Sequence, residues 1–131
     1  MKAAVFCLSL VFLNIIALCQ NTSIAIIPEP VKLTKTTGDF TLPQNVIIHT
    51  VKSTELKQAV IQLQERFSVP TGYKATLSDN AASATIKLEL NQTADATLGN
   101  EGYTLSVKPN TIVIKANKTA GIFIISSCIF K

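Results

Sequence analysis

The stretch 53–67 constrains the fold more than any other part of the chain, because its apolar residues adopt the spacing of a helix. They recur at intervals of three and four residues and so form one stripe: Leu56, Ala59, Val60, Leu63 and Phe67. Ser53 is a suitable N-cap, and the Pro and Gly in Val69 to Gly72 stop the helix. Such a stripe must be buried against a sheet or a second helix.

The segments around this helix have the alternation of β-strands. Val46 to Thr50 is a short β-branched run, and 84–90 alternates between an apolar and a polar face. Two further alternating runs, 103–108 and 111–116, are joined by Pro109-Asn110, which predicts a β-hairpin.

Two weaker patterns complete the expected fold. Val31 to Leu42 alternates loosely around a turn at Thr36 to Asp39, which predicts a short hairpin-like excursion, and a second helix is expected to begin near Thr119. The order of the elements predicts an α+β domain: a largely antiparallel β-sheet with helices packed on one face.

The N-terminus has the features of an export signal. A basic residue is followed by an apolar run from Ala3 to Leu18, and the small residues before Gln20 suit a signal peptidase. We therefore predict a signal peptide at 1–19, a mature domain at 20–131, and a periplasmic or cell-surface location. Acylation of Cys19, which would make a lipoprotein, is the alternative. The apolar run is too short for a transmembrane span, which needs ~20 residues.

Composition and charge exclude several classes of function. The chain of 131 residues has 12 basic and 8 acidic side chains, and its lysines are dispersed, so we expect no nucleic-acid partner. Cys128 would be the one cysteine left in the mature domain, so neither a disulfide framework nor a cysteine metal site is expected.

No reactive constellation stands out. His49 is the single histidine and is expected to be a partly exposed residue at a strand end. The carboxylates occur singly, no nucleophile elbow or phosphate loop is present, and the two tyrosines, Tyr73 and Tyr103, are too few for a sugar-stacking surface. We therefore assign no catalytic, cofactor-binding or metal-binding residue, and we expect no cofactor.

Several short motifs occur in an order that is known from one enzyme family. They are Ile26-Ile27-Pro28-Glu29-Pro30, Gly38-Asp39-Phe40-Thr41-Leu42, the run from Glu101 to Val107, the run from Ile112 to Ala116, and Ala120-Gly121-Ile122-Phe123. Together they resemble the N-terminal domain of bacterial β-N-acetylhexosaminidases of glycoside hydrolase family 20. The resemblance covers nearly the whole mature chain.

The resemblance implies a non-catalytic domain. In such enzymes the reaction belongs to a following (β/α)8 barrel, where an Asp-Glu pair acts with the acetamido group of the substrate. No adjacent Asp-Glu is present here, and after Phe123 the sequence departs from the family pattern. We therefore expect a fragment of an exported β-N-acetylhexosaminidase from a truncated or frame-shifted gene. Its partner would be the missing barrel, and N-acetylhexosamine glycans would be reached only through that barrel.

A different class of function stays open. The chain could be a free-standing secreted binding or adaptor domain, for glycans or for a separate barrel chain. Whether it has enzymatic activity is therefore uncertain from the sequence.

Overall fold

The described part of the protein, residues 29–51 and 54–128 of a computed structural model, is a sheet with two α-helices on it. The elements in chain order are β1 (Asn45–Thr50), α2 (Lys57–Thr71), β2 (Lys74–Leu77), the short 3₁₀ helix η2 (Ala81–Ser83), β3 (Ile86–Leu90), β4 (Tyr103–Lys108), β5 (Thr111–Ala116) and α3 (Thr119–Cys128). Four of the five strands lie where the sequence predicted them. The fifth, β2, was not predicted.

The sheet is mixed and mostly parallel, so the prediction of a largely antiparallel sheet is wrong. Its order is β2-β1-β3-β5-β4, and the pairs β1/β2, β1/β3 and β3/β5 are all parallel. Because α2 carries the chain from β1 back across the sheet, the strand that follows it runs in the same direction as β1. Within the described sheet, the β4–β5 hairpin supplies the antiparallel pair, as predicted.

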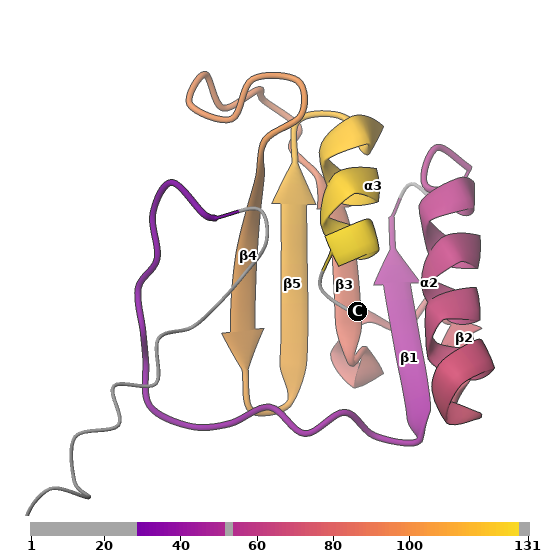
Figure 1. The fold of residues 1–131 in the computed structure, drawn as a ribbon. Coiled ribbons are helices and arrows are strands. Elements are labelled where there is room, and N and C mark those ends of the chain that lie inside the picture. The colour runs from indigo at the N-terminus through magenta and orange to yellow at the C-terminus, as the bar shows by residue number, and fades with distance from the viewer. Residues whose placement is uncertain (1–28, 52–53, 129–131) are drawn as a thin grey trace, which may run out of the picture.

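Both helices cover the same face of the sheet, which confirms the α+β class and the one-sided helix layer (Figure 1). The apolar stripe of α2 is buried as predicted, with Phe67 2% exposed and Leu63 fully buried. From α3, Ile122 and Ile125 enter the same core. The sheet contributes the alternate residues of its strands: Val46, Ile48, Ile86, Leu88, Ile112, Ile114 and Ala116.

The ends of α2 differ from the prediction. The helix begins at Lys57, after Leu56, which makes no side-chain cap. The predicted cap, Ser53, lies outside the described residues. At the other end the helix includes Pro70 in its last turn and stops at Gly72, whose φ of 71° is left-handed and whose N–H donates to the Ser68 carbonyl. The helix therefore starts directly after Leu56, the first residue of the stripe, and ends about one turn after Phe67, the last.

The segment before β1 is irregular, so the hairpin-like excursion predicted at 31–42 is wrong. This segment has no strand pairing, and its apolar residues Phe40 and Leu42 pack against the core. The segment runs along the β4 side of the sheet and beneath it before it reaches β1 (Figure 1). The predicted signal peptide, 1–19, lies outside the described residues.

Candidate functional site

His49 has a structural environment. Its side chain is 9% exposed, so it is more buried than predicted. Its Nδ1 lies 2.9 Å from the Ser78 carbonyl, and because a carbonyl can only accept, Nδ1 carries the proton. In the part of the chain that the structure describes, no three His, Cys, Asp or Glu side chains come together in a possible metal site. His49 therefore ties β1 to the loop after β2.

The two tyrosines do not form a sugar-stacking platform. Tyr103 lies opposite Ala116 in the hairpin and packs against the core, as its alternation predicted. Burial, and to a lesser degree the nearby Cys128, raises the pKa of the Tyr103 phenol. Cys128 is a half-buried thiol without a disulfide. Tyr73 lies between Gly72 and β2, at the opposite edge of the sheet from Tyr103, which begins β4.

Asn117 fixes the long polar loop 91–102. Its Oδ1 accepts from the Asn91 amide group and the Asp95 N–H, at 2.9 and 2.8 Å. Its Nδ2 donates to the carbonyls of Asp95 and Gly99, both at 2.7 Å. All hydrogen-bonding groups of the side chain are therefore occupied, and the loop has one fixed position over the ends of β3 and β5.

Asp95 stabilises the same loop from within. Its carboxylate accepts from the hydroxyl and the N–H of Thr97, at 2.7 and 2.9 Å, and these two bonds hold the pKa of Asp95 below its ordinary value of 3.8. A carboxyl with a lowered pKa stabilises the folded state above its unfolded pKa, and this contribution is lost as the pH falls through the folded pKa. The loop is thus held at neutral pH.

The loop also touches α3, at Gly121. A Cβ on Gly121 would lie 2.5 Å from the Gly102 carbonyl oxygen and 2.8 Å from the Ala116 Cβ. Only a glycine permits this approach. The contact brings together the segments Glu101 to Val107 and Ala120 to Phe123, two of the motifs that the sequence singled out.

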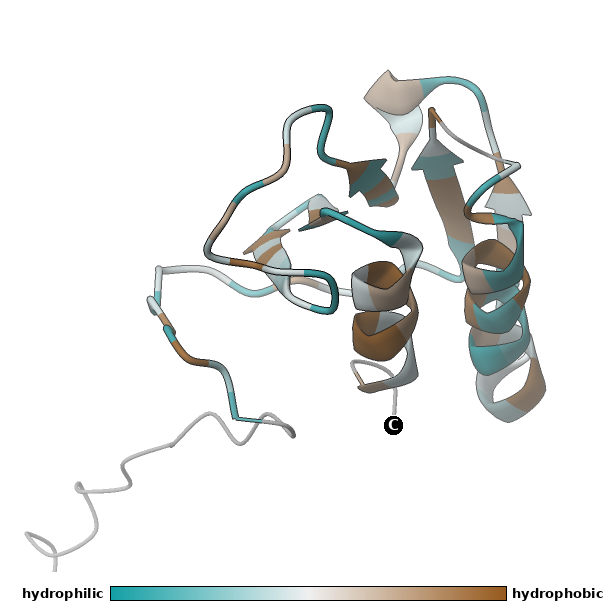
Figure 2. Ribbon diagram, turned by 90° about the horizontal axis from the view of Figure 1, so that it is seen from above, coloured by the Kyte–Doolittle hydropathy of each residue, from teal (hydrophilic) through white to brown (hydrophobic). Residues whose placement is uncertain are grey.

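The outer surface of α3 is unusually apolar. The helix contains no charged residue, and its hydropathy is high in its middle turns (Figure 2), whereas α2 carries a polar side. Phe123 is 45% exposed and Ile124 is half-buried. Exposed apolar side chains on an uncharged helix are suited to a partner that covers them.

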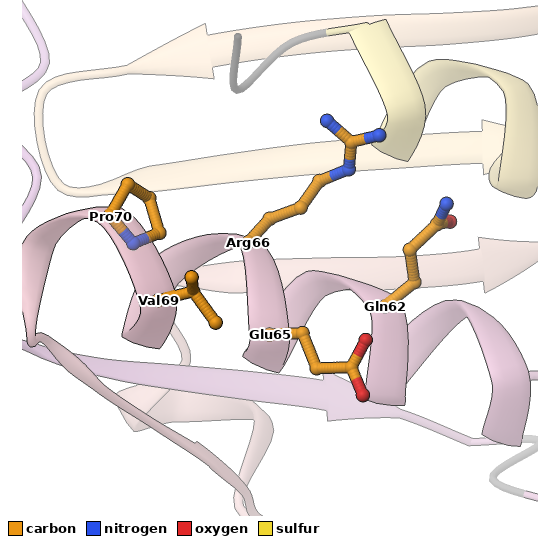
Figure 3. Close-up of a pocket in the computed structure, with 5 residues that line it drawn as sticks. All are labelled: Gln62, Glu65, Arg66, Val69 and Pro70. Atoms are coloured by element: carbon orange, nitrogen blue, oxygen red, sulfur yellow. The ribbon is translucent and has the colours of Figure 1, made fainter.

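Beside α3, the outward side of α2 has a shallow depression of about 400 Å³. It is lined by Gln62, Glu65, Arg66, Val69 and Pro70. Figure 3 shows Gln62 and Arg66 extending toward α3 and Glu65 extending away from it. Gln62 also hydrogen-bonds Ser126 and Ser127 of α3, both at 3.3 Å. We name the outer sides of α2 and α3 together the helix-layer surface.

Comparison with known proteins identifies the family of this domain. Residues 23–124 match the model of glycosyl hydrolase family 20, domain 2. The chain belongs to this family. It corresponds to the N-terminal, non-catalytic domain of the family 20 β-N-acetylhexosaminidases, which confirms the resemblance drawn from the motifs. A search of the curated proteins finds no match.

Solved family 20 enzymes share the fold. The β-N-acetylhexosaminidase of Streptomyces coelicolor A3(2) matches with a TM-score of 0.67 and 24% identity, over 77% of this chain and 20% of that one. A product-bound Streptomyces plicatus β-hexosaminidase matches with a TM-score of 0.67 and 26% identity, over 77% of this chain and 19% of that one. The Bacteroides fragilis β-N-acetylhexosaminidase matches with a TM-score of 0.59 and 20% identity, over 79% of this chain and 20% of that one. The chain thus spans about a fifth of the length of these enzymes.

Among the described residues of this family 20 domain, neither α2 nor α3 is long and apolar enough to cross a membrane. The features that the sequence did not indicate are the bonds of Asn117, the Gly121 contact and the helix-layer surface. Gly121 does belong to a family motif, Ala120 to Phe123, but the motif did not predict the contact with Gly102.

Proposed function

We propose that this family 20 domain supports the catalytic barrel of an exported β-N-acetylhexosaminidase and has no activity of its own. The observation that carries the proposal is the match of residues 23–124 to the second domain model of the family. The enzymes with the same fold are about five times as long as this match, so the domain accompanies a much larger catalytic part in them. The reaction, hydrolysis of terminal N-acetylhexosamine residues, belongs to that part.

The helix-layer surface is the part of the domain best suited to the barrel. Phe123 and Ile124 of α3, with Val69 at the end of α2, leave apolar area exposed that a packed neighbour would cover. Arg66 and Glu65 flank this area and can satisfy polar groups of the partner. A surface with an apolar centre and a polar rim is typical of a stable interface.

A chimera tests this proposal. This domain would replace the equivalent domain of the Streptomyces coelicolor enzyme, and activity on a chromogenic N-acetylglucosaminide would be followed during heating. We expect the chimera to be active and the isolated chain to show no turnover. Phe123→Glu should destabilise the chimera by about 2 kcal/mol, because the interface would bury a charge without a partner.

The matched control is Val31→Glu, which introduces the same charge at a fully exposed residue of the segment before β1. We expect it to change stability by less than about 0.5 kcal/mol. Equal effects of the two substitutions would show that the barrel does not cover α3. Turnover by the isolated chain that depends on one of its own residues would refute the supporting role.

We also propose that the domain is exported, to the periplasm or the cell surface, on the strength of the signal-like sequence at 1–19. In a bacterial host that processes this signal, the mass of the mature protein should correspond to a start at Gln20. A mass with added acyl chains on Cys19 would indicate the lipoprotein form instead. An uncleaved protein in the cytoplasm would contradict export.

A further inference from the structure

A crevice lies at the end of the sheet opposite to the β4–β5 turn. It has a volume of about 310 Å³ and is bounded by the carboxyl ends of β1 and β3 and by Lys115 of β5. These three strands are parallel neighbours. After β1 the chain moves to one edge of the sheet to form β2, and then returns to the other side of β1 to form β3. In doubly wound sheets, which carry helices on both faces, ligands bind at the carboxyl ends of strands where the order reverses in this way. This sheet has its helices on one face (Figure 1) and shares with doubly wound sheets the reversal at the carboxyl ends.

Polar groups from two strands meet in the crevice. The Glu89 carboxylate and the Lys115 ammonium form an ion pair at 2.7 Å, with side chains 36% and 49% exposed. Gln92 adds an amide at the rim, and Leu90 adds half-buried apolar surface. An ion pair that is this exposed is weak, so either group can turn to a ligand hydroxyl at little cost.

The position of Asn91 makes part of the crevice rigid. Its N–H donates to the Ala116 carbonyl at 2.8 Å, and its side-chain Nδ2 donates to Asn117 Oδ1 at 2.9 Å. Since Asn117 is itself held by bonds to Asp95 and Gly99, the side-chain amide of Asn91 is held in place where it lines the crevice. A polar group that is already held in place lowers the cost of ordering when a ligand binds.

The balance of charge indicates the class of ligand. Glu89 and Lys115 neutralise each other, so the crevice favours neither a cation nor an anion, and its lining side chains include both donors and acceptors. Its volume is at the lower end of ligand-binding pockets, which fits one small molecule. We propose that the crevice is a non-catalytic binding site for a single neutral sugar unit. The choice of a sugar as the ligand rests on the proposed function. The expectation that this ligand is uncharged rests on the ion pair in the crevice.

The affinity is expected to be modest. No aromatic side chain lines the crevice, so the stacking that strengthens most sugar sites is absent from the described lining. A dissociation constant in the millimolar range is sufficient if the site holds one unit of a glycan whose end is bound by the barrel.

The test is a titration of the isotopically labelled protein with N-acetylglucosamine, followed by amide chemical shifts. We expect saturable shifts at Asn91, Gln92 and Lys115. Removing the ammonium with Lys115→Met and the amide with Gln92→Ala should each weaken binding at least about threefold, and the double variant about tenfold. Glucuronic acid and glucosamine, which carry one charge each, should bind more weakly than the neutral sugar.

Lys87→Met is the matched control, since Lys87 lies two residues before Glu89 on the same face of β3 but does not line the crevice. It should leave the affinity unchanged. Lys115→Gln, which keeps a polar group, provides a second variant should Lys115→Met disturb the hairpin. Absence of saturable shifts, shifts confined to other regions, or equal losses in the control would overturn the proposal. Failure here would leave the supporting role intact, because that role is tested at Phe123 on the helix layer.

Discussion

Replacing Phe67 by alanine is expected to lower the free energy of unfolding of this domain by about 3–5 kcal/mol. Phe67 is the largest side chain of the core, is 2% exposed, and lies near the end of the α2 stripe. The loss combines the transfer of the ring to water with the cavity that it leaves. Because small domains have a total stability of about 5–15 kcal/mol, the variant should be partly unfolded at 37 °C.

Thermal unfolding followed by circular dichroism measures this effect. The melting temperature should fall by at least about 10 °C. Phe123→Ala is the matched control, since it removes the same side chain from a position that is 45% exposed, and it should change stability by less than about 0.5 kcal/mol in the isolated domain. Similar losses in the two variants would mean that α3 is covered within the isolated protein.

Replacing Gly121 by alanine is expected to destabilise the domain by about 1–3 kcal/mol, although helix propensity acts in the opposite direction. In an unhindered helix, the change from Gly to Ala gains about 1 kcal/mol. Here the new Cβ would lie 2.5 Å from the Gly102 carbonyl oxygen, so α3 or the loop must move. The loop resists such movement because Asn117 holds it at Asp95 and Gly99.

The adjacent residue provides the control for Gly121. Ala120 is exposed in the first turn of α3, and Ala120→Gly should reveal the propensity effect alone, a loss of up to about 1 kcal/mol. Urea unfolding of both variants gives the comparison. If Gly121→Ala raised stability by the amount that Ala120→Gly lowers it, propensity would dominate and the close approach to Gly102 would be unimportant.

The sequence predicted those helices and strands that are long enough for their pattern of apolar residues to repeat several times. Five apolar residues at helical spacing predicted α2, and the turn at Pro109-Asn110 between two alternating runs predicted the β4–β5 hairpin. By contrast, β2 has four residues, and Ala75 is the one that packs against the core, so its alternation is too short to recognise. Because β2 was not predicted, the crossover from β1 to β2 was not predicted either, and neither was the parallel direction of these strands.

The surfaces were less predictable than the elements, because they depend on contacts between distant residues. Asn117 reaches Asn91 across 26 residues, and nothing in the local sequence distinguishes it from an ordinary surface asparagine. The crevice depends on strand order, since Glu89 and Lys115 become neighbours only when β5 pairs with β3. The family motifs included the segments that contain Gly102 and Gly121, but they did not predict that these segments touch.

The position of β5 has a consequence for how the domain assembles. β5 lies between β3 and β4 in the sheet, although β4 comes before β5 along the chain. Within the described sheet, β4 pairs with β5 alone. During synthesis β4 therefore has no place in the sheet until β5 has emerged. Hairpins form rapidly from local contacts, so β4 and β5 would dock onto β3 as one preformed unit. The sheet stays incomplete until residue 116 has left the ribosome, and α3 can cover it only afterwards.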